Sequence, residues 1–146
     1  MSALRNLLED QGYRRIKMKF TKTNHFEVVA KINKIEGRFI LDTGATFSCI
    51  GFETATRFKL LAEHSGLRAA GAGETNMNTK ISRNNLVNIE DWINEYTDLI
   101  LFDITNVNEA LAYYNIKKVD GIIGADILTK GKAIIDYDNI TLYLKQ

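Results

Sequence analysis

The stretch from Phe39 to Ile50, FILDTGATFSCI, constrains the fold of this chain more than any other. Apolar residues lead into Asp42, a small polar segment follows, and apolar residues resume at Phe47, which predicts two strands joined by a short loop. A carboxylate buried at such a strand end is costly unless it is paired or hydrogen-bonded, and Gly44 permits a tight turn. We therefore expect a buried acid in a functional site, although the string also fits a helix cap or an ordinary turn.

Composition narrows the classes of function. The 146 residues suit one domain with a sufficient core, and 19 basic against 18 acidic residues, a net charge of +1, argue against nucleic acid as a partner. Cys49, His25 and His64 offer no zinc-ligand spacing, so we expect no metal and no cofactor. Because no apolar core of a signal peptide and no membrane-span length of apolar residues is visible, we expect a cytoplasmic protein without a membrane partner.

Two parts of the chain differ in pattern. Residues 1–25 are expected to form an extension, with a helix over 3–11 that places Leu4, Leu7 and Leu8 on one face. From Arg15 apolar and basic residues alternate, which favours a half-buried strand over a nucleic-acid patch. Residues 26–146 are expected to form a single domain.

Within that domain, strand-like apolar runs bounded by turn residues predict strands, and two segments have helical patterns. The expected strands are 26–32, 37–41, 86–89, 99–104, 133–137 and 140–144, and the expected helices are 53–63 and 108–114. A glycine-rich segment at 66–73 opens a hairpin over about 69–82. A second apolar run, VDGIIGADIL at 119–128, echoes the first, and Trp92 is expected to be a packing anchor.

The order of these elements resembles the retropepsin-like aspartic peptidases, including their small single-domain cellular and bacterial members. The resemblance rests on the Asp-Thr-Gly-Ala-Thr loop from Asp42, the glycine-rich hairpin and Ile122-Ile123-Gly124 before a short helix, and it covers about residues 26–144. It implies a mostly β, closed-barrel fold with a few short helices. It also implies an aspartic endopeptidase whose site is shared by two copies of the loop.

The chain carries only one such loop, because neither Asp120 nor Asp126 begins a second Asp-Thr-Gly motif. We therefore expect a homodimer in which the Asp42 carboxylates of two subunits meet and activate a water molecule against a peptide or protein substrate. By resemblance, Thr43 hydrogen-bonds across the dimer and Gly44 permits close packing of the two loops.

The resemblance also assigns positions around the catalytic pair. Ala45 and Thr46 are expected along the substrate cleft. The hairpin is expected to be a flap with a polar tip near 76–78, and its candidate residues are Gly71, Gly73, Asn76 and Met77. The residues expected to support the loop are Ile122, Ile123 and Gly124, and Asp126 is expected to cap a helix or form an ion pair.

Several alternatives remain open at this level. A dimer of this fold could bind peptides or assemble without turnover. The Asp42 loop also has the general look of a phosphate loop of actin-like ATPases, and Gly71-Ala72-Gly73 that of a dinucleotide loop. Cys49 and His64 could pair as nucleophile and base, although a buried core cysteine is the simpler reading. The chain could also be a segment of a viral or transposon polyprotein.

Overall fold

The computed structural model describes residues 2–71 and 74–146, with side chains described outside 65–71 and 74–77. Three α-helices and one 3₁₀ helix lie in this part of the chain: α1 (Ala3–Asp10), η1 (Phe52–Thr54), α2 (Thr105–Tyr113) and α3 (Ala125–Lys130). The strands are β1 (Tyr13–Lys17), β2 (Lys19–Phe20), β3 (Phe26–Ile32), β4 (Ile35–Leu41), β5 (Cys49–Gly51), β6 (Ala62–Gly71), β7 (Glu74–Ile89), β8 (Trp92–Phe102), β9 (Gly121–Ile123), β10 (Ile134–Asp136) and β11 (Thr141–Lys145).

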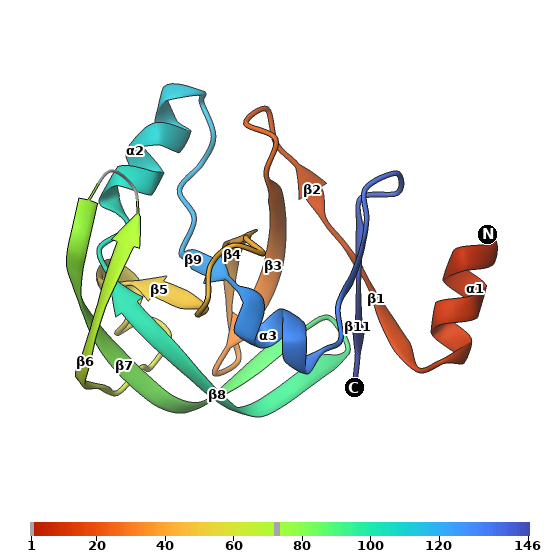
Figure 1. Ribbon diagram of the computed structural model, residues 1–146, viewed down its shortest axis with the longest axis horizontal. Helices are drawn as coiled ribbons and strands as arrows, with labels where there is room; N and C mark the ends of the chain where they lie inside the picture. Colours follow the sequence, from red (N-terminus) through yellow and green to blue (C-terminus); the bar gives the residue numbers. More distant parts are fainter. Residues whose placement is uncertain (1, 72–73) are drawn as a thin grey trace.

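The larger sheet closes on itself. Its strand order is β2-β3-β4-β9-β5-β8-β7-β6, and a further pairing of β3 with β7 at Ile32 and Val87 joins the six described strands β3, β4, β9, β5, β8 and β7 into a barrel (Figure 1). Two of its pairings, β4 with β9 and β5 with β8, are parallel, and the others are antiparallel. The predicted mostly β, closed-barrel fold with a few short helices is confirmed.

The C-terminal part of β4 is buried on both faces. Phe39 and Leu41 belong to the main core, whereas Ile40 between them belongs to a second core beneath α2. Side chains alternate along a strand, so one short segment can serve both cores. Trp92 is 2% exposed and donates its indole N–H to the Lys145 carbonyl at 3.0 Å, which confirms its predicted role as a packing anchor.

The N-terminal segment contributes to the same core. Strand β1 pairs with β11, which also pairs with β10, and Ile16 on β1 is 1% exposed in the main core. The predicted first helix is present as α1, at one end of the molecule in Figure 1. Leu8 is its buried residue, whereas Leu4 and Leu7 are exposed.

The predicted helix over 53–63 is wrong. Only η1 and a series of turns occupy this segment, Lys59 has a φ of 59°, and β6 begins at Ala62. Phe58 is fully buried with its ring centroid 6.1 Å from that of Phe39. Packing of this aromatic ring into the barrel, rather than helix propensity, decides the local conformation.

The predicted hairpin over 69–82 is longer than expected, and residues 76–78 do not form its tip. Gly71 pairs with Glu74, and Met77 pairs with Ala69. Residues 76–78 therefore lie in the arm β7, and the expected tip at these positions is wrong, because polar side chains do not prevent a backbone from pairing in a ladder. Gly73 lies outside the described residues.

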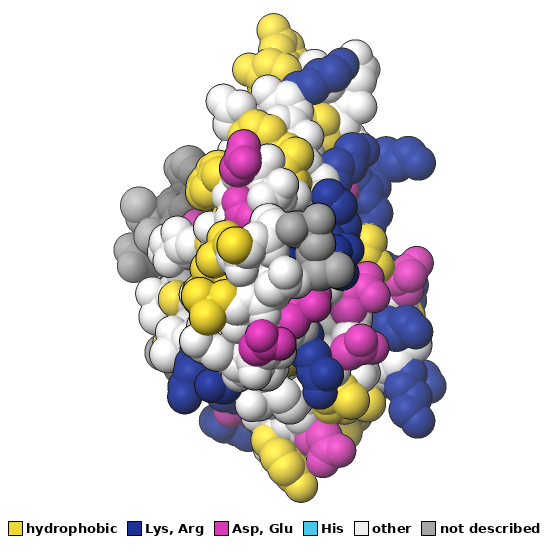
Figure 2. Space-filling view, turned by 90° about the vertical axis from the view of Figure 1, so that its right-hand side faces the viewer, with side chains coloured by type: hydrophobic (Ala, Val, Ile, Leu, Met, Phe, Trp, Pro, Cys, Tyr) yellow, Lys and Arg dark blue, Asp and Glu magenta, His cyan; other side chains and the backbone are white. Residues whose placement is uncertain are grey.

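Among the described residues, no helix combines the length and apolar character that crossing a membrane requires. Figure 2 shows Lys and Arg side chains gathered at the upper right of the face drawn there, next to a group of acidic side chains nearer its centre. Charge is therefore unevenly distributed on a chain whose net charge is only +1.

Replacing Gly121 by Ala is expected to lower the free energy of unfolding by about 3 kcal/mol. A Cβ at Gly121 would lie 2.0 Å from the Cys49 carbonyl oxygen, and backbone atoms of β5 must then move. Urea unfolding measures the loss. Gly131→Ala is the comparison, because its Cβ would meet only side-chain atoms of Leu144, the nearest at 2.7 Å. An equal loss in both variants would contradict the account of β9 packing.

Candidate active site

Asp42 directly follows β4 and continues its pairing with β9. Its N–H donates to the Ile123 carbonyl at 2.9 Å, so the backbone is held in the ladder up to the carboxylate. The Asp42 side chain is exposed, as are Thr43 and Gly44. The expected burial of this acid is therefore wrong for the single chain, because the end of β4 lies at the surface, where water solvates the charge.

The loop orients its own carboxylate. The Gly44 N–H donates to Asp42 Oδ1 at 2.8 Å, and the Ala45 N–H donates to the Asp42 carbonyl at 3.2 Å. A Cβ at Gly44 would lie 3.3 Å from Asp42 Oδ1. The absence of a side chain at Gly44 therefore lets its backbone approach the Asp42 carboxylate closely. Of the remaining predicted loop residues, Ala45 is half-buried and Thr46 is exposed.

The second apolar run packs directly against this loop. Ile122 pairs with both Ile40 on β4 and Cys49 on β5, and Ile123 pairs with Leu41. Gly124 is held close, since a Cβ there would lie 2.5 Å from the Ala45 carbonyl oxygen. The Ala125 N–H donates to that same oxygen at 2.7 Å. The structure thus brings Ile122 and Ile123 into contact with the strands that flank the loop, and Gly124 into contact with the loop backbone. These are the three residues expected to support the loop.

A buried polar cluster that the sequence analysis missed joins the two motifs. Ser48 is 1% exposed, accepts a hydrogen bond from the Gly124 N–H at 2.8 Å and donates its hydroxyl to Asp126 Oδ1 at 2.6 Å. The Ser48 N–H also donates to the Asp126 carboxylate, at 2.9 and 3.0 Å. The sequence signal was a lone hydroxyl within an apolar run, because a buried polar group needs a partner.

Asp126 therefore has a structural role different from the two that were predicted. The residue at the N-cap of α3 is Gly124, and Asp126 lies in the first turn. Its carboxylate accepts from Ser48 and from the Ile127 N–H. Hydrogen bonds from one loop, rather than an ion pair, account for its position among the described residues.

The structure does not bring Cys49 and His64 together as nucleophile and base. Cys49 lies on β5 and His64 on β6, with β8 and β7 between these strands in the sheet. Burial, together with the negative charge of Asp126, raises the pKa of the Cys49 thiol to about 12. Cys49 is thus the expected core cysteine, and His25 and His64 are exposed.

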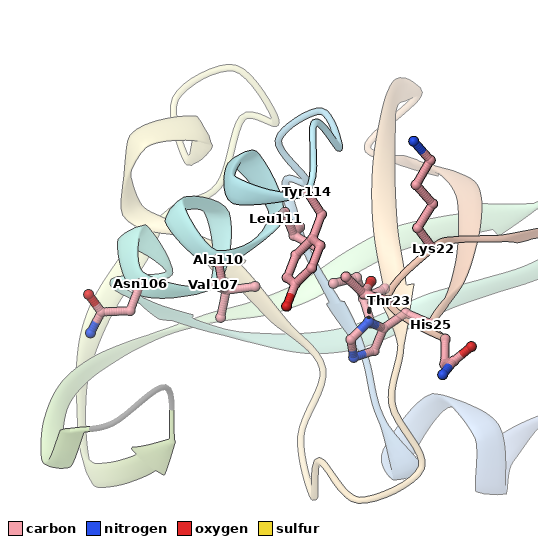
Figure 3. Close-up of a pocket in the computed structure, with 10 residues that line it drawn as sticks. Lys22, Thr23, His25, Asn106, Val107, Ala110, Leu111 and Tyr114 are labelled. Carbon is pink, nitrogen blue, oxygen red and sulfur yellow. Dashed lines mark hydrogen bonds between the residues drawn. The ribbon is translucent and has the colours of Figure 1, made fainter.

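A cavity of about 580 Å³ opens beside the candidate catalytic loop. Figure 3 shows side chains of α2 on one side of it and the turn at residues 22–25 on the other. Ile40 also lines the cavity. Ile40 precedes Asp42 by two residues, so alternation along the strand places both side chains on one face. The lining side chains include Val107, Leu111 and Tyr114.

The described side chains offer no set of ligands for a metal ion. Among the side chains that the structure describes, those of residues 2–64 and 78–146, His, Cys, Asp and Glu form no group of three that could hold a metal ion.

Solved structures with the same architecture define the class of fold. EIAV protease complexed with the inhibitor HBY-793 aligns over 81% of this chain and 98% of its own, with a TM-score of 0.58 and 19% identity. A retropepsin-like aspartic protease from Rickettsia conorii aligns over 91% of this chain and 89% of its own, with a TM-score of 0.55 and 20% identity. The retroviral protease-like domain of Ddi1 from Leishmania major aligns over 81% of this chain and 86% of its own, with a TM-score of 0.54 and 21% identity. The chain has a retropepsin-like fold.

The family follows from a sequence comparison. The aspartyl protease family model matches residues 28–127, more than half of the 146-residue chain. This protein belongs to the aspartyl protease family. No sequence among the curated proteins matches it. The matched range includes Asp42 and ends beside Asp126, so it contains both motifs that meet at the candidate site.

Replacing Ser48 by Ala is expected to lower the free energy of unfolding by about 1–3 kcal/mol, because the buried Gly124 N–H and the Asp126 carboxylate each lose a partner. Urea unfolding measures the change. Thr46→Ala is the matched control, since Thr46 is an exposed hydroxyl of the same loop. A loss below that of the control would contradict the role of the Ser48 cluster.

The Cys49 thiol is expected to react with iodoacetamide at neutral pH at least about a hundredfold more slowly in the folded protein than in urea. A pKa of about 12 keeps the thiol protonated, and only the thiolate is a good nucleophile. Mass spectrometry of the alkylated protein measures both rates. Rapid labelling of the folded chain would show that Cys49 is accessible and ionised, contrary to its placement in the core.

Proposed function

We propose that this protein is an aspartic endopeptidase that acts as a homodimer, with the Asp42 carboxylate of each subunit in a shared site. One observation carries the proposal: Asp42 is exposed at the end of β4 while the Gly44 N–H holds its carboxylate in a fixed orientation. An oriented, uncovered acid in a chain of the aspartyl protease family fits a site completed by a second copy.

The two-fold relation supplies what one chain lacks. In an isologous dimer each subunit presents the same patch, so one Asp42 loop faces another. We propose that the exposed Thr43 lies beside its own copy in this dimer and hydrogen-bonds across the interface. The close backbone contacts of Gly124 behind each loop keep the facing carboxylates in position.

The proposed reaction is hydrolysis of a peptide bond by water. Two carboxylates about 3 Å apart cannot both be ionised readily, so the pair holds one proton. The ionised Asp42 takes a proton from a bound water while the protonated Asp42 donates a hydrogen bond to the scissile carbonyl. The water oxygen adds to the carbonyl carbon, and the leaving amine then receives a proton from the pair. No covalent bond to the enzyme forms.

The substrate is proposed to be an extended peptide. Half-buried Ala45 and exposed Thr46, at the end of the catalytic loop, are proposed to line the cleft along which the peptide passes. The β6–β7 hairpin, which includes Gly71, Asn76 and Met77, is proposed to close over the peptide and pair with its main chain.

A catalytically silent module for peptide binding or assembly is the second candidate. The exposure of Asp42 in the single chain also fits a dimer that holds a peptide without cleaving it. The two candidates share the fold and the interface and differ only in turnover.

Replacing Asp42 by Asn is expected to lower the cleavage rate of a mixed peptide library at least about a hundredfold, because general acid–base catalysis is lost. Cleavage is measured by mass spectrometry from acidic to neutral pH, and sedimentation of the same samples reports the dimer.

Asp138→Asn is the matched control for this experiment. Asp138 is exposed in the turn between β10 and β11, so cleavage by this variant is expected to stay at the wild-type rate. Wild-type protein that is dimeric and binds peptides without cleaving them would contradict the peptidase proposal and favour the silent module.

A further inference from the structure

A second cavity, of about 740 Å³, adjoins the one beside the catalytic loop. The two share Lys22 and Tyr114 in their linings, so they form one groove between the turn at residues 22–25 and the segment that follows α2. Ile40, which precedes Asp42 by two residues, lines the first cavity. One end of the groove thus reaches β4 close to where this strand leads into the proposed catalytic loop.

The far part of this groove is basic. Its charged lining comprises Lys17, Lys19, Lys22, Arg38, Lys117 and a single described acid, Glu27. Glu27 is already ion-paired with Arg38, and the Lys17 ammonium lies 3.4 Å from the Asn139 carbonyl oxygen. Three exposed ammonium groups, those of Lys19, Lys22 and Lys117, remain.

This positive charge is local. The whole chain carries a net charge of only +1. A third cavity, of about 400 Å³, has the opposite character, with Glu53, Asp103 and Asp120 against Lys118 in its lining. Since the basic residues converge on one groove and the acidic ones on another, the groove beside Asp42 has a charge preference of its own.

The strand register gives the distance between the lysines and the catalytic acid. Lys19 on β2 pairs with Glu27 on β3, which pairs with Ile40 on β4. Residues directly opposite in antiparallel strands point to the same face, so all three side chains share the face of Asp42. Two strand spacings and two residues along β4 place the Cα atoms of Lys19 and Asp42 about 12 Å apart, the span of about three to four residues of an extended peptide.

We propose that this groove binds the substrate on each side of the cleaved bond and selects acidic side chains about three to four residues from it. The inference rests on the proposed function for its catalytic centre. An aliphatic or aromatic side chain nearer the bond enters the cavity between Ile40, Val107 and Leu111, and carboxylates further along meet Lys19, Lys22 and Lys117. Because an isologous dimer repeats the groove, the preference holds on both sides of the bond.

The test uses the library peptide that the protein cleaves best or, if none is cleaved, the one that Asp42→Asn binds most tightly, in three matched forms. These carry Glu, Gln or Lys at the positions three and four residues from the cleaved bond or, without cleavage, from the central bond. The expected kcat/KM order is Glu above Gln above Lys, with roughly three- to tenfold between Glu and Gln at low ionic strength. High salt is expected to reduce the difference, because these lysines are exposed.

Lys117→Glu and Lys118→Glu form a matched pair for this test. The two residues are adjacent and exposed, but Lys117 lines the basic groove and Lys118 lines the acidic cavity. Lys117→Glu is expected to reduce the preference for Glu peptides, and the triple variant with Lys19→Glu and Lys22→Glu to reverse it. Lys118→Glu is expected to leave the preference unchanged.

Binding of the same peptides to Asp42→Asn, measured by fluorescence anisotropy, separates this inference from the peptidase proposal. If no peptide is cleaved but Glu peptides bind more tightly and the triple variant reverses this order, the groove assignment holds and the peptidase proposal fails. Equal cleavage and equal binding of the three peptides would overturn the groove assignment. So would tighter binding of a single-stranded DNA oligonucleotide than of the Glu peptide.

Discussion

The junction between the two apolar runs is the constraint on which the rest of this structure depends. In the first run β4 leads into Asp42, and in the second β9 leads into Gly124. The two strands pair in parallel, so the segments after them meet. Parallel pairing requires a long crossover, and β5, the β6–β7–β8 strands and α2 all lie within it. Three of the six barrel strands, β5, β7 and β8, therefore belong to the crossover that joins β4 to β9.

Buried polar contacts hold this junction, whereas its reactive group is exposed. The Ser48 hydroxyl links the Gly124 N–H to the Asp126 carboxylate inside the protein, and the Asp42 carboxylate lies outside it, oriented by Gly44. An exposed acid on a loop that buried hydrogen bonds hold in place suits a surface that a second copy of the chain covers. In the proposed dimer the acid becomes buried on assembly, and a proton shared by the two Asp42 carboxyl groups removes the repulsion between them.

Much of this could be predicted from the sequence where local pattern and tertiary packing agree. The strand-like runs at 26–32 and 37–41 and the glycine-punctuated run at 119–128 are present as β3, β4, β9 and α3. Prediction failed where contacts between distant residues decide the conformation. Phe58 packs against Phe39 and the segment after β5 is not a helix. Ser48 and Asp126 are 78 residues apart, so no local pattern could have revealed their contact.

The most direct test of the shared site is to mix wild-type protein with increasing amounts of Asp42→Asn and let the subunits exchange at constant total concentration. If two Asp42 residues act together, only wild-type pairs are active, and peptide cleavage is predicted to fall with the square of the wild-type fraction. If one chain holds a complete site, cleavage falls in direct proportion to that fraction, and this linear result would contradict the account.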